Sequence, residues 1–66
     1  MCYLLSTEAQ DLGLVLRTDA LDRAKTEAKI EGAAVFVRDE ISDDLVYSVD
    51  PKEVVFWADG SVYFGG

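Results

Sequence analysis

The sequence contains no histidine, and its only cysteine is Cys2. Without histidine the chain lacks the commonest general base and the commonest nitrogen ligand for metal ions. A serine or cysteine nucleophile would have no partner to activate it, and Cys2 has no second cysteine for a disulfide or a CxxC motif. We therefore expect no enzyme, no catalytic residue, no cofactor and no metal, with Cys2 serving as a small buried hydrophobic residue.

Basic residues and long apolar runs are also scarce. Six Lys and Arg stand against thirteen Asp and Glu, and the resulting net charge of −7 repels phosphate backbones and anionic lipid headgroups. No apolar run approaches the ~20 residues that cross a bilayer, and no basic segment opens the chain as in a secretion signal. These absences predict a cytoplasmic protein that contacts neither nucleic acid nor membrane directly.

No segment rich in proline, glycine or serine divides the chain, and none repeats, so residues 1–66 are expected to form a single domain. A domain of this size buries only ~60% of the surface of its unfolded chain and is marginally stable. Association with a copy or with a partner would stabilise it.

The hydrophobic pattern predicts strands around one helix. Residues 2–6 and 13–17 are short apolar runs separated by a polar stretch, which indicates a strand, a turn and a strand. Residues 20–31 are predicted to be helical, because Thr18 and Asp19 offer an N-cap and Gly32 offers a left-handed C-terminal stop. On this helix Ile30 lies away from a narrow stripe that can approach a sheet closely, formed by Ala20, Leu21, Ala24 and Ala28.

Beyond Gly32, residues 33–39 and 45–49 are β-branched and aromatic runs, and Asp59-Gly60 between two further runs predicts a hairpin. In a type I′ turn, Trp57 would face Val62 and Val55 would face Phe64 on one side, while Phe56 would pair with Tyr63 on the other. The expected fold is α+β: one helix on a small, mainly antiparallel sheet of four or five strands, in β-β-α-β-β-β or β-α-β-β-β order.

One helix can cover only one face of such a sheet. The opposite face, with Phe56 and Tyr63 and with Phe36 as a further candidate, then needs a cover or a partner. The alternative is that the sheet curls and packs these side chains on itself. Trp57 and the other aromatics are expected in the core or in a protein contact, because a platform for stacking bases would need a positive groove.

The acidic residues gather in the second half of the chain. Asp39, Glu40, Asp43 and Asp44 surround a predicted turn, but they do not form a calcium loop, because Ile41 replaces a ligand and no glycine supplies the sharp turn. Such a cluster is either a solvated turn or a surface that meets basic residues of a partner. The residues predicted to bind a partner are Asp39, Glu40, Asp43, Asp44, Asp50, Glu53, Asp59, Phe56 and Tyr63.

Two resemblances extend this reading. In size, charge and lack of reactive groups the chain resembles small phage-encoded inhibitors, including anti-CRISPR and anti-restriction proteins, some of which present carboxylates where phosphates would lie. The ending Gly65-Gly66 resembles that of ubiquitin-like proteins and of sulfur carriers, which implies adenylation of the terminal carboxylate. The resemblance to phage-encoded inhibitors implies an inhibitor that blocks a basic, nucleic-acid-binding surface of a partner protein. The alternatives are a carrier and a structural homo-oligomer subunit such as a homodimer.

Overall fold

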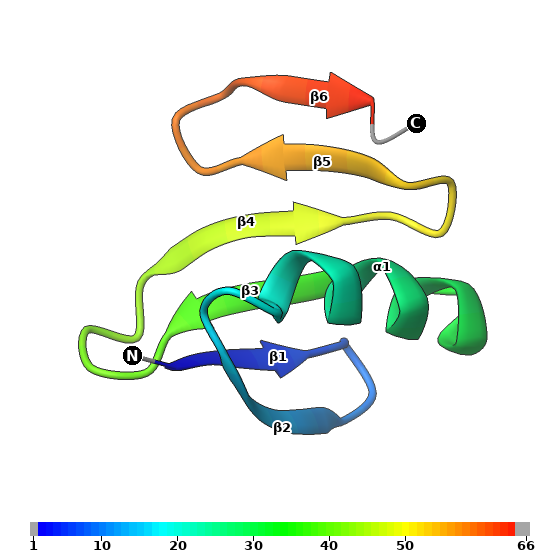
Figure 1. The fold of residues 1–66 in the computed structure, drawn as a ribbon. Helices are drawn as coiled ribbons and strands as arrows, with labels where there is room; N and C mark the ends of the chain where they lie inside the picture. Colours follow the sequence, from blue (N-terminus) through cyan, green and yellow to red (C-terminus); the bar gives the residue numbers. More distant parts are fainter. Residues whose placement is uncertain (1, 65–66) are drawn as a thin grey trace.

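The computed structural model describes residues 2–64, with the side chains of Tyr63 and Phe64 outside the described part. Six strands and one helix follow each other along these residues (Figure 1). Their bounds are β1 (Cys2–Ser6), β2 (Asp11–Leu16), α1 (Ala20–Glu31), β3 (Val35–Asp39), β4 (Leu45–Val49), β5 (Val54–Trp57) and β6 (Val62–Phe64).

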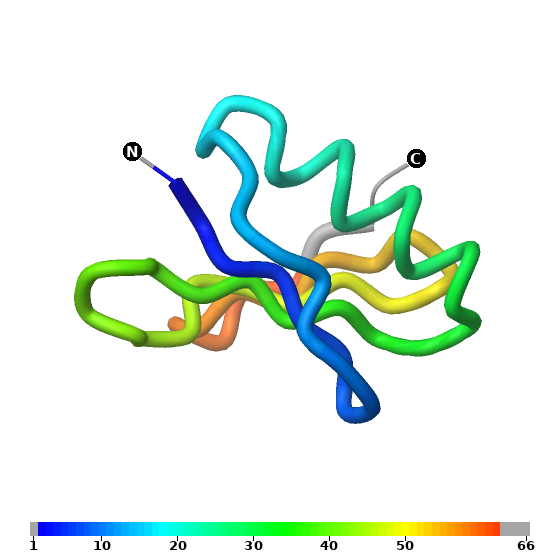
Figure 2. Tube along the Cα trace, turned by 90° about the horizontal axis from the view of Figure 1, so that it is seen from below, coloured from blue at the N-terminus to red at the C-terminus, as the bar shows by residue number. Residues whose placement is uncertain are grey.

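The strands form one sheet in the order β2-β1-β3-β4-β5-β6, and every neighbouring pair is antiparallel. The predicted α+β class and the β-β-α-β-β-β order are confirmed, and the short strand β6 follows as the sixth. Figure 2 shows α1 along one side of the sheet. On the other side the described residues form no second layer, although the β1–β2 hairpin bends in that direction.

Helix α1 begins and ends where its capping signals predict. Gly32 adopts a left-handed φ of 64°, and its N–H donates to the Ala28 carbonyl at 2.9 Å. Asp19 occupies the N-cap position without a side-chain capping bond. Ala20, Ala24 and Ala28 of the predicted stripe are fully buried and Ile30 is 68% exposed, as predicted, whereas Leu21, predicted on the same stripe, is 37% exposed. The 12 residues of α1, the single helix of the described chain, are too few and too polar to cross a membrane.

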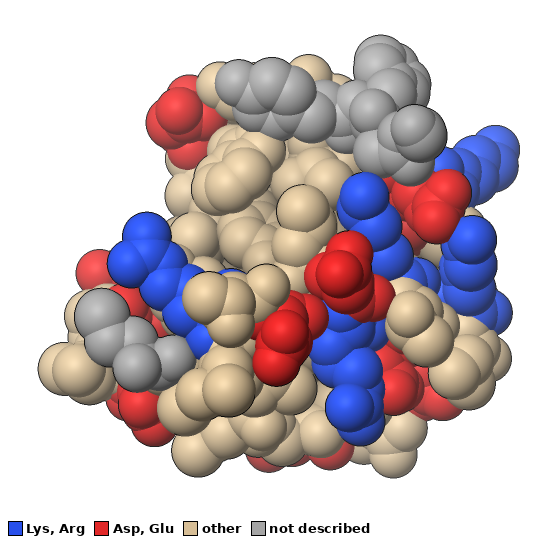
Figure 3. All heavy atoms as spheres, viewed as in Figure 1, with Lys and Arg blue, Asp and Glu red and all other residues tan. Residues whose placement is uncertain are grey.

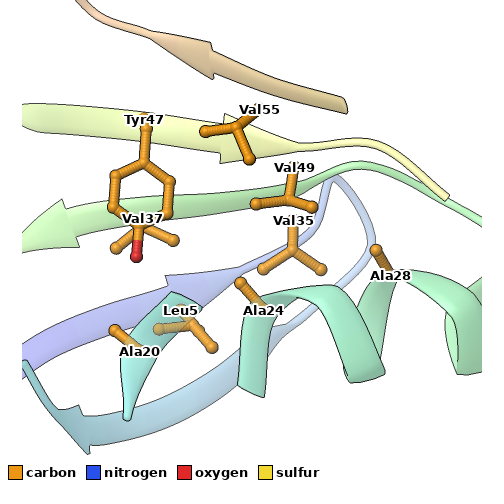
Figure 4. Close-up of a cluster of buried hydrophobic side chains, with 9 residues drawn as sticks. All are labelled: Leu5, Ala20, Ala24, Ala28, Val35, Val37, Tyr47, Val49 and Val55. Atoms are coloured by element: carbon orange, nitrogen blue, oxygen red, sulfur yellow. The ribbon is translucent and has the colours of Figure 1, made fainter. Parts of the chain in front are cut away.

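The core lies between α1 and one face of the sheet, called here the helix face (Figure 4). Paired residues of antiparallel strands share a face, so the register defines two rows of side chains. One row runs across the strands through Leu5, Val37, Tyr47 and Trp57, and the other runs through Val35, Val49 and Val55. The alanine stripe lets the helix approach these rows closely.

The β5–β6 hairpin differs from the prediction by one residue in register. Phe56 pairs with Val62 and Val55 pairs with Tyr63, so the predicted pairs Phe56–Tyr63, Trp57–Val62 and Val55–Phe64 are wrong. A type I′ turn needs positive φ at both central residues, but only Gly60 of this turn has one, at 97°. The connection instead has three residues, 58–60, closed by a Trp57 N–H bond to the Ser61 carbonyl at 2.8 Å.

Candidate functional site

The face of the sheet that α1 does not cover is apolar, and it is called here the open face. The register places on it the row Asp11, Ser6, Phe36, Ser48, Phe56 and Val62 and the row Leu14, Leu4, Arg38 and Leu45, with the pair Cys2 and Leu16 beside them. Asp11 and Arg38 are the two charged side chains among these described residues. The strands thus present apolar side chains on both sides, where an antiparallel sheet covered on one side usually alternates with polar residues.

The exposed fractions of its side chains show how much of the open face is covered by neighbouring residues of the same chain. Phe36 and Leu4 are half-buried, so neighbouring side chains cover the centre in part. Leu14, Leu16, Phe56 and Val62 remain between 43% and 57% exposed. Curling of the sheet therefore does not remove the surface from water. Phe56 lies on it as predicted, whereas the side chain of Tyr63 lies outside the described residues.

The acidic loop between β3 and β4 is shaped by one of its own carboxylates. Asp39 Oδ1 accepts hydrogen bonds from the backbone N–H groups of Ile41 at 2.8 Å and Ser42 at 3.2 Å. Asp43 adopts a left-handed φ of 62°, and its carbonyl accepts a bond from Arg38 at 3.4 Å. Within the described residues, the carboxylates of Glu40, Asp43 and Asp44 have no hydrogen bond or ion pair and are exposed.

The other three predicted acidic residues also stabilise local structure. Asp50 Oδ1 accepts bonds from the N–H groups of Lys52 and Val54, each at 2.9 Å. Asp59 Oδ1 accepts a bond from the Ser61 N–H at 2.8 Å, which holds the pKa of this carboxyl below its usual range. A hydrogen bond and ion pair with Lys29, at 2.9 Å, lowers the pKa of Glu53 in the same way.

The seven predicted acidic residues do not form one surface. The β3–β4 loop and the β5–β6 turn lie at one end of the sheet, which brings Asp59 to the same end as residues 39–44 (Figure 1). Asp50 and Glu53 lie in the β4–β5 connection at the opposite end, next to the last turn of α1. Consecutive antiparallel strands run in opposite directions, so the β3–β4 and β4–β5 connections lie at opposite ends of the sheet. The two acidic groups are therefore separated, although they are close in sequence.

On the helix side, a pocket of about 220 Å³ opens at the end of the sheet where β1 begins and β5 ends. This aromatic pocket is lined by Tyr3, Arg17, Leu21, Val46, Tyr47 and Trp57. The ring centroids of Tyr47 and Trp57 lie 4.9 Å apart, and the two ring planes make an angle of 52°. Burial, with a smaller contribution from Tyr3, raises the pKa of the Tyr47 hydroxyl to about 12, so it remains protonated at neutral pH.

The sequence did not predict this pocket, because its residues come from three strands, a turn and the helix and share no spacing. The isolated base Arg17, between an apolar strand and the helix of an acidic chain, was the one local signal. In Figure 3, basic and acidic side chains border an uncharged region on this side of the molecule.

The remaining chemical groups are dispersed. Cys2 is half-buried and pairs with Leu16 at the margin of the open face, so it lies outside the buried core. Among the described residues, no three His, Cys, Asp or Glu side chains are grouped to hold a metal ion. Gly65 and Gly66, on which the carrier alternative depends, lie outside the described residues.

Comparisons of the chain with protein-family models, with curated proteins and with solved structures found no match.

Proposed function

We propose that this is a non-enzymatic binding protein that seats its open face on a partner protein. The observation that carries the proposal is the exposure of Leu14, Leu16, Phe56 and Val62 on a sheet face that no other described element covers. Such side chains do not contribute to the core of the monomer. Apolar patches of this kind mark contact sites in soluble proteins.

The dimensions of the chain suit such a contact. A specific interface covers ~800 Å² on each partner, which is about a fifth of the 4239 Å² of accessible surface that the protein exposes. One face of a small sheet supplies an area of this order. Phe36 and Phe56 lie near the middle of the open face, where aromatic anchors contribute most to binding.

Charge defines the kind of partner. Glu40, Asp43, Asp44 and Asp59 border the sheet at one end, and the bonds of Asp39 hold the loop that carries three of them. Carboxylates on an ordered loop attract and orient lysines and arginines without the cost of ordering the loop on binding. The proposed partner therefore has a basic surface, of the kind that binds nucleic acid, and this protein inhibits it by covering that surface.

Three variants of the full chain test this function. Affinity capture from the native cells, followed by purification of the captured protein, supplies the partner for titration. Phe56→Ser with Val62→Ser removes a cross-strand apolar pair from the open face, and Asp43→Asn with Asp44→Asn removes two charges from the loop. Ile30→Ser removes an apolar side chain of α1 that is 68% exposed and is the control, with circular dichroism as the check of folding.

The open-face double variant should weaken binding at least ~30-fold, because loss of two interface anchors typically costs ~2 kcal/mol or more. The loop double variant should slow association about tenfold at low salt and less at high salt. The control should leave the affinity unchanged. Equal affinities for all variants would show that neither surface binds the partner.

A further inference from the structure

We infer that a second copy of this chain inserts Ile41 into the aromatic pocket, so that two copies form a symmetric dimer. Ile41 is 82% exposed, more than any other large hydrophobic side chain of the described residues. It lies in the β3–β4 loop, which projects beyond the strands in Figure 2. The backbone N–H groups of Ile41 and Ser42 donate to Asp39 Oδ1, and these bonds hold the backbone of this projection.

The aromatic pocket has the size for one side chain. Its 220 Å³ is below the ~300–1,000 Å³ of pockets that hold small-molecule ligands. Its walls combine Trp57, Tyr3 and Tyr47 with Arg17, the residue types that dominate binding energy at protein interfaces. Leu21 and Trp57 are each 37% exposed at this site, so an aliphatic side chain placed there would remove apolar surface of both chains from water.

Charge complementarity identifies the occupant as a second copy. Ile41 is flanked by Glu40 and followed by Asp43, whose carboxylates have no partner within the described residues. Arg17 borders the pocket, is exposed, and likewise makes no ion pair within the described residues. Two chains of net charge −7 repel each other over most of their surfaces, but an acidic loop that docks beside Arg17 brings opposite charges together.

The placement of the two features allows a closed dimer. The β3–β4 loop, Arg17 and the start of β1 all lie at the same end of the molecule. A two-fold axis at this end would let each Ile41 enter the pocket of the other chain at once, which closes the assembly and does not extend it into a fibre. The open face is left uncovered, so the dimer is independent of the proposed function except that both use the acidic loop.

Sedimentation and tryptophan fluorescence test the dimer, because Trp57 is the only tryptophan and lines the pocket. The purified chain should show twice its 7.3 kDa mass at high concentration, and dilution should shift Trp57 emission to the red as the pocket becomes hydrated. Ile41→Asp should raise the dimer dissociation constant at least tenfold. Ile30→Asp, an equal change at the exposed isoleucine of α1, should leave the constant unchanged.

Charge reversal gives a second measurement that a defect in folding cannot imitate. Arg17→Glu alone, and Glu40→Lys with Asp43→Lys alone, should each be monomeric, because like charges would then meet at both pockets of the dimer. A mixture of the two variants should form a heterodimer, since every pocket then faces a loop of opposite charge.

A wild-type chain that stays monomeric up to ~1 mM, where even weak contacts associate, would overturn the inference. So would equal effects of Ile41→Asp and Ile30→Asp, or a mixture of the charge variants that remains monomeric. A dimer that survives Ile41→Asp but is lost in Phe56→Ser with Val62→Ser would place the second copy on the open face. That last result would overturn this inference and also give the open face an occupant other than the proposed partner.

Discussion

The two faces of the sheet are both apolar, yet they are built from different side chains. The helix face is packed by valines, Leu5 and Tyr47 against alanines of α1, and the side chains of this core are between 0% and 4% exposed. The open face presents leucines, phenylalanines and Val62, and four of its side chains, Leu14, Leu16, Phe56 and Val62, stay about half exposed. Small and β-branched residues thus form most of the close contact with the helix, whereas leucines and phenylalanines dominate the open face.

Under the proposed function, this difference separates the residues that fold the chain from the residues that bind a partner within a single sheet. A two-layer domain needs only one apolar face, and its outward face is normally polar. Strand β5 instead reads Val54, Val55, Phe56 and Trp57, without alternation. The apolar residues of the open face add nothing to the core, which is why we assign them to contact with another protein.

Neighbouring residues of β5 provide the largest expected contrast. Val55→Ser should destabilise the protein by about 3 kcal/mol, because it removes buried methyl groups and buries a hydroxyl among apolar side chains. This is a large part of the ~5 kcal/mol expected for a chain of this length. Phe56→Ser, one residue away on the open face, should cost less than ~1 kcal/mol. Urea unfolding followed by circular dichroism measures both, and similar losses would mean that the open face contributes to the fold.

The acidic residues also differ in their expected effect on stability, since some accept backbone hydrogen bonds and others are exposed without a partner among the described residues. Asp50→Ala should lower the free energy of unfolding by about 1–2 kcal/mol, because two backbone N–H groups lose their acceptor in a tight turn. Asp44→Ala removes the same charge from the loop at the other end and should change stability by less than ~0.5 kcal/mol. Thermal unfolding of the two variants decides the point; a reversed order would show that the exposed carboxylates stabilise the fold and are not free for a partner.

The elements predicted from the sequence are those fixed by local signals. Helix α1 follows from its alanine stripe and from Gly32, and the strands follow from their β-branched runs. Register required more than local signals, since the Asp59-Gly60 pair is compatible with turns of two or three residues, and the carboxylate of Asp59 accepts a hydrogen bond within the longer one. The division of the acidic residues between two ends and the aromatic pocket depend on which strands are neighbours, which no segment specifies alone.

The smallest expected effect concerns the turn that sets this register. The Asp59 carboxylate accepts the Ser61 N–H, so its pKa is lowered in the folded protein. A carboxyl with a lowered folded pKa stabilises the fold above its unfolded pKa, and this contribution disappears as the pH falls through the folded value. Asp59→Asn keeps an acceptor oxygen but cannot ionise. The urea midpoint of wild type should therefore be higher than that of Asp59→Asn at pH 7. This difference should vanish as the pH falls below 3.8, the ordinary pKa of an aspartate side chain.

The urea midpoint must be measured against pH for both wild type and Asp59→Asn, because protonation of the other carboxyls also relieves the repulsion within a chain of net charge −7. Subtracting the curve of Asp59→Asn removes most of that shared contribution. Glu40→Gln removes one charge from an exposed loop residue and serves as the charge control. If Asp59→Asn and Glu40→Gln differ from wild type equally at every pH, the Asp59 bond does not hold the turn. The pairing of Phe56 with Val62 on the open face would then depend on side-chain packing alone.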